Sequence, residues 1–180
     1  MRSFGRKTIR LPDWDYASSA WYFLTICTHH RISIFGRIVD DLMVLNALGR
    51  IADEEWKRSP EIRKQLGLDA YVIMPNHMHG IVILRREDDH IRRDSPQPSV
   101  GAHGGAPLQR PPRSLGSFVA GFKARVTKRI NQHRRTPGTP VWQRGYFDHI
   151  VRDQRDLDRI RSYILHNPAK WALDKYHLEA

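Results

Sequence analysis

The apolar positions of the chain fall into segments with two different periods. Short runs rich in aromatic and β-branched side chains, typical of strands, cover residues 21–28 (WYFLTICT), 70–74 and 77–84. The last two runs are separated by Pro75 and Asn76, which are turn residues. We therefore predict one strand near the start of the chain and a β-hairpin later on.

Three other segments show the spacing of amphipathic helices, and they cover residues 40–59, 114–133 and 153–167. In the first segment, Leu42 and Leu45 begin an apolar face. The second segment starts at Ser114 or Ser117, and the third starts at Asp153, which are residue types that cap helix N-termini.

The order of these segments predicts the fold class. With a short extended segment over residues 141–151, the order is β-α-β-β-α-β-α. This order indicates an α+β fold, in which an antiparallel or mixed sheet carries its helices on one face. The length of 180 residues suits a single domain over 1–180. Residues 87–113 are polar, charged and rich in Pro and Gly, so we expect a flexible internal loop there.

The charge of the chain indicates a polyanionic partner. Lys and Arg number 30 against 19 Asp and Glu, which gives a net charge of +11. Such a surplus is typical of proteins that bind nucleic acid, although it also occurs on basic surfaces that are merely solvated. The candidate DNA-binding residues are Lys123, Arg125, Lys128, Arg129, Arg144 and Arg152.

The expected compartment is the cytoplasm. Cys27 is the single cysteine, so the fold needs no intramolecular disulfide and no oxidising environment. No apolar run approaches the ~20 residues of a membrane span, and we expect no membrane association.

His77 and His79 form half of a candidate metal site. Side chains alternate along a strand, so these two imidazoles point to the same side. Imidazole suits zinc, copper, iron and nickel, whereas a mixed nitrogen and oxygen site with open positions is also compatible with Mg²⁺ or Mn²⁺. A histidine pair of this kind can also be two polar neighbours without a metal.

The last predicted helix offers groups that could complete the site. Tyr163 and Asn167 are one helical turn apart, so they share a face. Asn167 could give a carbonyl oxygen to the metal, and Tyr163 could act as a nucleophile. Alternatively, Tyr163 packs in the core and Asn167 caps the helix. Tyr146 is a rival nucleophile, but it lies in a segment that is predicted to be extended rather than helical.

Five motifs together resemble the REP-associated tyrosine transposases, which belong to the single-tyrosine transposases of bacterial insertion sequences. In chain order the motifs are YFLTICTHHR, YVIMPNHMHGIV, SFVAGFKARVTKRIN, VWQRGYFDHIVRD and YILHNP. The histidines of the second motif match the His-hydrophobic-His (HUH) signature of that family.

The resemblance implies a ferredoxin-like antiparallel sheet with helices packed on it, and an enzyme that cuts single-stranded DNA containing a hairpin. His77, His79 and Asn167 would bind Mg²⁺ or Mn²⁺. Tyr163 would attack a phosphate, leaving a 5′-phosphotyrosine bond and a free 3′-hydroxyl. Family members work as monomers or as homodimers. Two alternatives are a non-cutting regulator of repeat elements on the same fold and a metal-dependent phosphodiesterase that makes no covalent bond to DNA.

Overall fold

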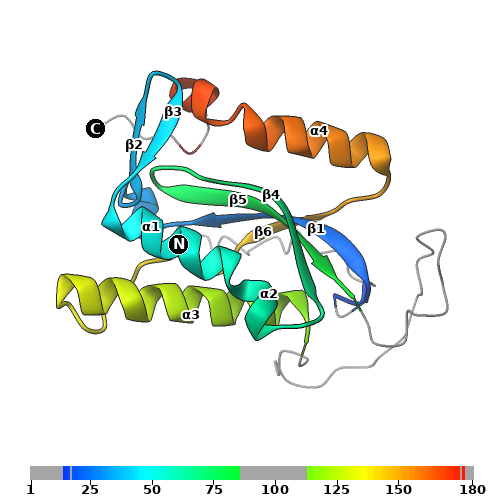
Figure 1. The fold of residues 1–180 in the computed structure, drawn as a ribbon, viewed down its shortest axis with the longest axis horizontal. Helices are drawn as coiled ribbons and strands as arrows, with labels where there is room; N and C mark the ends of the chain where they lie inside the picture. Colours follow the sequence, from blue (N-terminus) through cyan, green and yellow to red (C-terminus); the bar gives the residue numbers. More distant parts are fainter. Residues whose placement is uncertain (1–13, 17, 86–112, 175, 177–180) are drawn as a thin grey trace, which may run out of the picture.

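A four-stranded antiparallel sheet forms the centre of the protein in the computed structural model, which describes residues 14–16, 18–85, 113–174 and 176 (Figure 1). Its strands are β1 (Ala20–Cys27), β4 (Leu66–Ile73), β5 (His77–Leu84) and β6 (Phe147–Ile150), in the order β4-β5-β1-β6. β1 pairs with β5 along its whole length, from Ala20 opposite Leu84 to Cys27 opposite His77. Two interleaved β-α-β units produce this order, which confirms the predicted α+β, ferredoxin-like sheet.

Helices cover both faces of the sheet. α1 (Ala47–Lys57), the short α2 (Ser59–Ile62) and α3 (Leu115–Arg134) lie on one face, and α4 (Gln154–Leu165) lies on the other (Figure 1). The short 3-10 helices are η1 (His29–Arg31) and η3 (Pro168–Leu173), which follows α4. The prediction that the helices share one face is wrong for α4.

The physical reason lies in β1, which is apolar on both sides. Tyr22 and Leu24 join the core beneath α1 and α3, whereas Phe23 joins Ile81 in a second cluster beneath α4. A strand that is apolar at successive positions, rather than at alternate ones, is typical of a sheet buried on both faces.

The predicted first helix is too long at its N-terminal end. A hairpin of β2 (Gly36–Val39) and β3 (Leu42–Leu45) occupies this region, so Leu42 and Leu45 lie in a strand. The hairpin turns at Asp40 and Asp41, whose φ angles of 49° and 61° are those of a type I′ turn. Asn46 then starts α1, because its side chain accepts hydrogen bonds from two N–H groups of the first turn.

The other two predicted helices are confirmed. Ser114 caps α3 by accepting from the Ser117 N–H, and Asp153 caps α4 by accepting from the Asp156 N–H. Apart from Arg113, the predicted loop over 87–113 lies outside the described residues. Within the described parts of the chain, every helix is too short or too polar to cross a bilayer.

The core beneath α1 holds β5 in position. Trp56 of α1 is fully buried, and its ring lies directly over Gly80 of β5. A Cβ atom at Gly80 would lie 2.4 Å from that ring, so only glycine allows this close approach. The neighbouring residue, His79, faces the opposite side of the sheet, toward α4.

Candidate metal centre and tyrosine

The two histidines of β5 meet beneath α4. Their side chains are 0% and 1% exposed, and the Nε2 atoms of His77 and His79 lie 3.0 Å apart. Met78, between them, points into the core on the other face, as the strand alternation predicts.

Hydrogen bonds fix the protonation of the His77 ring. The Asn76 amide nitrogen donates to the backbone oxygens of Arg31 and Tyr176, at 3.0 and 2.6 Å. Its Oδ1 must therefore be the atom that lies 2.8 Å from His77 Nδ1, and it accepts a hydrogen bond from that nitrogen. In the neutral ring, His77 Nε2 then carries a lone pair.

The His79 ring has a corresponding partner on β1. Its Nδ1 lies 2.8 Å from the hydroxyl of Thr25, which can accept a hydrogen bond. With this tautomer, His79 Nε2 also carries a lone pair and faces that of His77. The Thr25 hydroxyl can also donate, and His79 Nε2 then carries the hydrogen and donates it to His77 Nε2. Bonds from outer residues to the far ring nitrogen, as here, are typical of metal-binding histidines.

Asp174, just after η3, adds a carboxylate to the pair. Its Oδ2 lies 3.8 Å from His77 Nε2, and the Asp174 side chain is 5% exposed. One ligand atom from each of His77, His79 and Asp174 lies within 4.8 Å of the others. Sequence reasoning did not find Asp174. A single acid after a short helix has no distinctive spacing, and only the folded path of the chain brings it to β5.

Asn167, between α4 and η3, carries a further candidate oxygen ligand. Asn167 is 2% exposed, and its Oδ1 has no hydrogen-bond partner in the described part of the chain. Although it precedes η3, its side chain makes no capping hydrogen bond. A buried carbonyl oxygen without a partner costs about 1–3 kcal/mol, which a bound cation would remove. The two imidazoles and the Asp174 carboxylate form a donor set that fits a divalent cation.

Tyr163 of α4 reaches the same place. Its hydroxyl lies 3.2 Å from His79 Nε2, while the residue as a whole is 42% exposed. Burial, together with the nearby Asp174 and Tyr176, raises the pKa of Tyr163 to about 12, although a hydrogen bond from Asn167 acts in the opposite direction. The phenol and both imidazoles of this group belong to one chain.

Three apolar residues and one ion pair hold α4 in this orientation. Leu157, Ile160 and Ile164 pack against the sheet around Phe23. On the same helix, Arg161 makes two hydrogen bonds to the carboxylate of Asp69, at 2.9 and 2.6 Å. These contacts fix the rotation of α4, and with it the direction of the Tyr163 side chain.

Tyr146, the rival nucleophile, lies elsewhere. Tyr146 packs against the core on the α1 and α3 side of the sheet, and Trp142 is buried in that core with 8% exposure. His166 turns back on its own helix, where its Nδ1 lies 2.7 Å from the backbone oxygen of Ser162.

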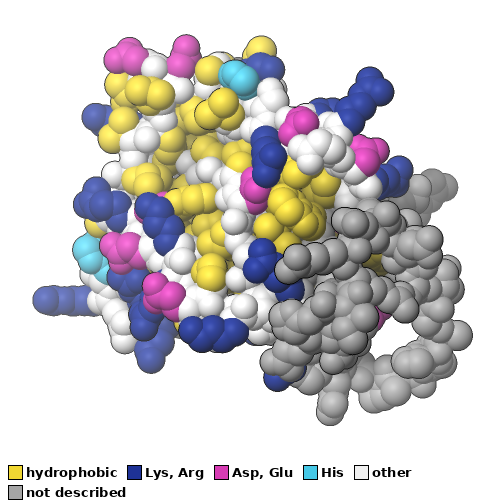
Figure 2. Space-filling view, turned by 45° about the vertical axis from the view of Figure 1, so that its right-hand side comes forward, with side chains coloured by type: hydrophobic (Ala, Val, Ile, Leu, Met, Phe, Trp, Pro, Cys, Tyr) yellow, Lys and Arg dark blue, Asp and Glu magenta, His cyan; other side chains and the backbone are white. Residues whose placement is uncertain are grey.

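Several of the predicted DNA-binding residues are engaged within the protein. Arg125 and Arg129 of α3 pair with the buried Glu55 of α1, at 2.9 and 3.0 Å. Lys123 donates hydrogen bonds to the backbone oxygens of Gln143 and Gly145. These three cations therefore connect α3 to its neighbours. Lys128, Arg144 and Arg152 are exposed. Figure 2 shows Lys and Arg side chains scattered over one face of the molecule.

Comparisons with known proteins agree with the sequence motifs. No family model matches the chain. An uncharacterized protein of Haemophilus influenzae is 33% identical over 174 residues, which cover 97% of this chain and 94% of that protein. The chain belongs to the family of this Haemophilus protein. A solved structure of a REP-associated tyrosine transposase bound to a REP hairpin matches with a TM-score of 0.58 and 18% identity. The match covers 97% of this chain and 77% of the transposase chain. This chain therefore has the fold of that transposase.

Proposed function

We propose that this protein is a metal-dependent nuclease and strand transferase that cuts single-stranded DNA through a covalent bond to Tyr163. One observation supports this most strongly: a phenol hydroxyl lies 3.2 Å from the imidazole of a buried histidine pair. The matched transposase is bound to a REP hairpin, and we extend that to a hairpin-containing DNA substrate here.

His77, His79 and Asp174 would hold the metal, and the Asn167 carbonyl oxygen would be a further ligand. This mixed set of nitrogen and oxygen donors suits Mn²⁺ or Mg²⁺. When bound, such a cation polarises a phosphate and makes a neighbouring phenol easier to ionise.

The protein's own residues account for the rest of the chemistry. Tyr163 loses its proton to solvent, which reaches the half-exposed phenol, and its oxygen forms a bond to phosphorus. The bond from phosphorus to the 3′ oxygen breaks, and that oxygen takes up a proton. The anchored α4 keeps the nucleophile in place, so little freedom is lost when the substrate binds. Because the phosphotyrosine bond conserves the energy of the cut bond, attack by a 3′-hydroxyl can rejoin strands without a nucleotide cofactor.

A library of labelled oligonucleotides tests this proposal. Each carries a hairpin flanked by randomised single-stranded segments, and it is incubated with the protein and Mn²⁺ and then denatured. We expect a DNA adduct that migrates with the protein, and sequencing of the bound DNA gives the cut site. Tyr163→Phe abolishes the adduct, whereas the matched variant Tyr146→Phe keeps it.

Two other outcomes of this experiment would indicate a different function. Cutting without an adduct would indicate a metal-dependent phosphodiesterase. A shift of the DNA without cutting, in both Mn²⁺ and Mg²⁺, would indicate a regulator that binds repeat elements on the same fold.

A further inference from the structure

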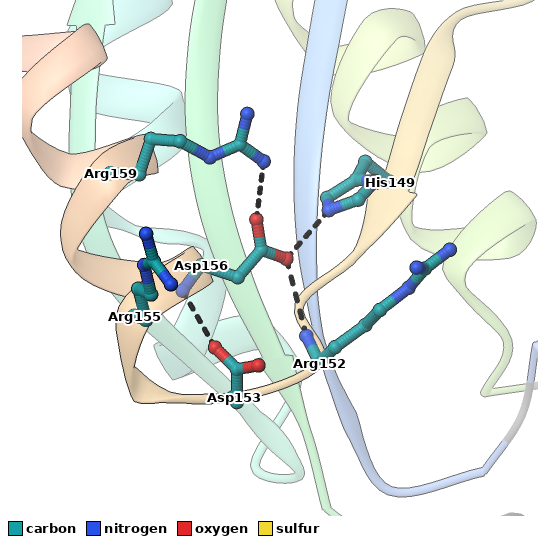
Figure 3. Close-up of a pocket in the computed structure, with 6 residues that line it drawn as sticks. All are labelled: His149, Arg152, Asp153, Arg155, Asp156 and Arg159. Carbon is teal, nitrogen blue, oxygen red and sulfur yellow. Dashed lines mark hydrogen bonds and ion pairs between the residues drawn. The ribbon is translucent and has the colours of Figure 1, made fainter.

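A second polar site lies at the start of α4, apart from the metal centre (Figure 3). It is a cavity of about 380 Å³, and its lining residues are His149, Arg152, Asp153, Arg155, Asp156 and Arg159. The site combines three guanidinium groups and an imidazole with two carboxylates, so cations outnumber anions even when His149 is neutral.

Asp156 organises this cavity. Its carboxylate accepts from Arg159 Nη2 at 2.6 Å, from His149 Nε2 at 2.7 Å and from the Arg152 backbone N–H at 3.3 Å. Figure 3 shows the Asp156 carboxylate between these three groups. Burial acts to raise the pKa of Asp156, but the hydrogen bonds from Arg159 and His149 together with the Arg152 N–H outweigh it and hold the pKa at about 2. Asp156 is therefore ionised at neutral pH and orients the Arg159 guanidinium.

Most of the guanidinium donors in the cavity remain available to a ligand. An arginine has five N–H donors, and Arg159 uses one of them on Asp156 while its side chain stays 75% exposed. Neither Arg152 nor Arg155 has a side-chain hydrogen bond or ion pair to another described residue. Asp153 already caps the first turn of α4, so the side chains, rather than the helix end, would bind the ligand.

The cavity and Tyr163 lie along the same helix. Arg159 is one turn from Tyr163 and faces the same side, and Asp156 is two turns away. At a rise of about 1.5 Å per residue, the cavity lies roughly 10 Å along the helix from the phenol. A DNA strand held at Tyr163 would therefore pass within reach of these arginines.

We propose that the cavity at the start of α4 binds a backbone phosphate of the single-stranded DNA substrate, a few nucleotides from the cut, through Arg155 and Arg159. This inference rests on the proposed function of Tyr163. A planar guanidinium group can bind two oxygens of one phosphate with two parallel hydrogen bonds. Such a contact fixes where the strand lies and carries no sequence information.

Binding measurements test the cavity independently of cutting. Fluorescence anisotropy is measured on a Tyr163→Phe background, which leaves the DNA intact, with hairpin oligonucleotides from the library or of arbitrary sequence. We compare Arg155→Gln, Arg159→Gln and the double variant with Arg58→Gln, which removes an exposed charge next to α2. Arg155→Gln breaks no contact to a described residue, so it tests the site without a risk to folding.

We expect the double variant to bind at least tenfold more weakly than Arg58→Gln at low salt. Its plot of log affinity against log salt should be shallower by about one unit for each phosphate that the variant no longer neutralises. In DNA whose phosphates are replaced singly by neutral methylphosphonates, one position near the cut should weaken binding to the parent protein and leave the double variant unaffected.

Equal affinities and equal salt slopes for the double variant and Arg58→Gln would overturn the phosphate site, even if the wild-type protein cuts DNA. If the cavity variants lose affinity but the wild type forms no adduct, the cavity binds DNA phosphate, while the strand-cutting proposal and the placement of that phosphate near a cut both fall. A protein that fails to bind any single-stranded DNA overturns both.

Discussion

At the residue scale, the candidate metal centre brings two buried imidazoles and a carboxylate close together, and the nearby Asn167 carries a buried amide oxygen. The Nε2 atoms of His77 and His79 face each other at 3.0 Å, and the Asn167 Oδ1 has no partner among the described residues. Buried polar groups are nearly always hydrogen-bonded, and an exception requires an explanation. We infer that a divalent cation held by the histidines would be the missing partner of the Asn167 oxygen.

Loss of the Asp174 carboxylate should weaken metal binding. We expect Asp174→Asn to lower the affinity for Mn²⁺ by at least about tenfold, since even indirect partners of metal ligands contribute that much. Isothermal titration calorimetry with Mn²⁺ alone measures this without DNA. Asp158→Asn, which changes an exposed acid of α4, is the matched control and should bind Mn²⁺ normally. Unchanged affinity in Asp174→Asn would exclude Asp174 as a ligand.

The pKa of Tyr163 gives a second test at this scale. Without a metal its value is about 12, because burial and the charge of Asp174 disfavour the phenolate. A near-ultraviolet titration of the metal-free protein, taken as the difference between wild type and Tyr163→Phe, should show this high value. Asp174→Asn should lower the pKa, since it removes the negative charge. The phenolate fraction rises with pH, so the rate of cutting should also rise across the neutral range. A phenol that titrates near 10 in the wild type would contradict this account.

At the scale of secondary structure, sequence reasoning succeeds where local signals and burial agree. The strand of His77 and the helix of Tyr163 follow from their periodicity and caps. The β2–β3 hairpin was missed because its apolar residues also fit a helical spacing, and the decisive signal was the Asp40-Asp41 turn. The position of α4 opposite the other helices depends on which strand faces are covered, and Asp174 depends on the path of the chain after η3. Neither is a local property.

The anchoring of α4 leads to a prediction about stability. Arg161 binds Asp69 of β4 through two hydrogen bonds, and this contact lowers the pKa of Asp69. Because both partners are partly exposed, we expect Asp69→Asn to reduce the free energy of unfolding by only about 1 kcal/mol. Amide hydrogen exchange should accelerate in α4 more than in α3. Uniform acceleration in both helices would mean that the pair stabilises the whole fold and has no specific role in positioning Tyr163.

The pH dependence of this contribution follows from the direction of the shift. The folded-state pKa of Asp69 lies below its unfolded value, so the ion pair stabilises the protein at pH values above the unfolded pKa. The contribution is lost as the pH falls through the folded-state pKa. The difference in stability between wild type and Asp69→Asn should therefore be present at neutral pH and disappear in acid.

At the scale of the whole molecule, the sheet separates the large hydrophobic core from the groups of the candidate site. The large core and the Glu55 ion pairs with α3 lie on one face, and the histidines, Tyr163 and the arginine cavity are associated with α4 on the other. The phenol and the histidines that lie together belong to the same chain.

Complementation between inactive variants tests this arrangement. When His77→Ala and Tyr163→Phe chains are co-expressed and purified together, every single chain lacks one half of the site, so we expect no DNA adduct. Wild type co-expressed with either variant serves as the control and should form adducts. Recovery of the adduct in the mixture of the two variants would show that the tyrosine of one subunit acts at the histidines of another.

Mass spectrometry of the covalent complex tests the central claim most directly. After incubation with DNA and Mn²⁺, digestion by nuclease and trypsin should leave a nucleotide phosphate attached to the peptide of residues 162–170, on Tyr163. The same adduct on the peptide of residues 145–152, which carries Tyr146, or cut DNA with no modified peptide, would contradict the account.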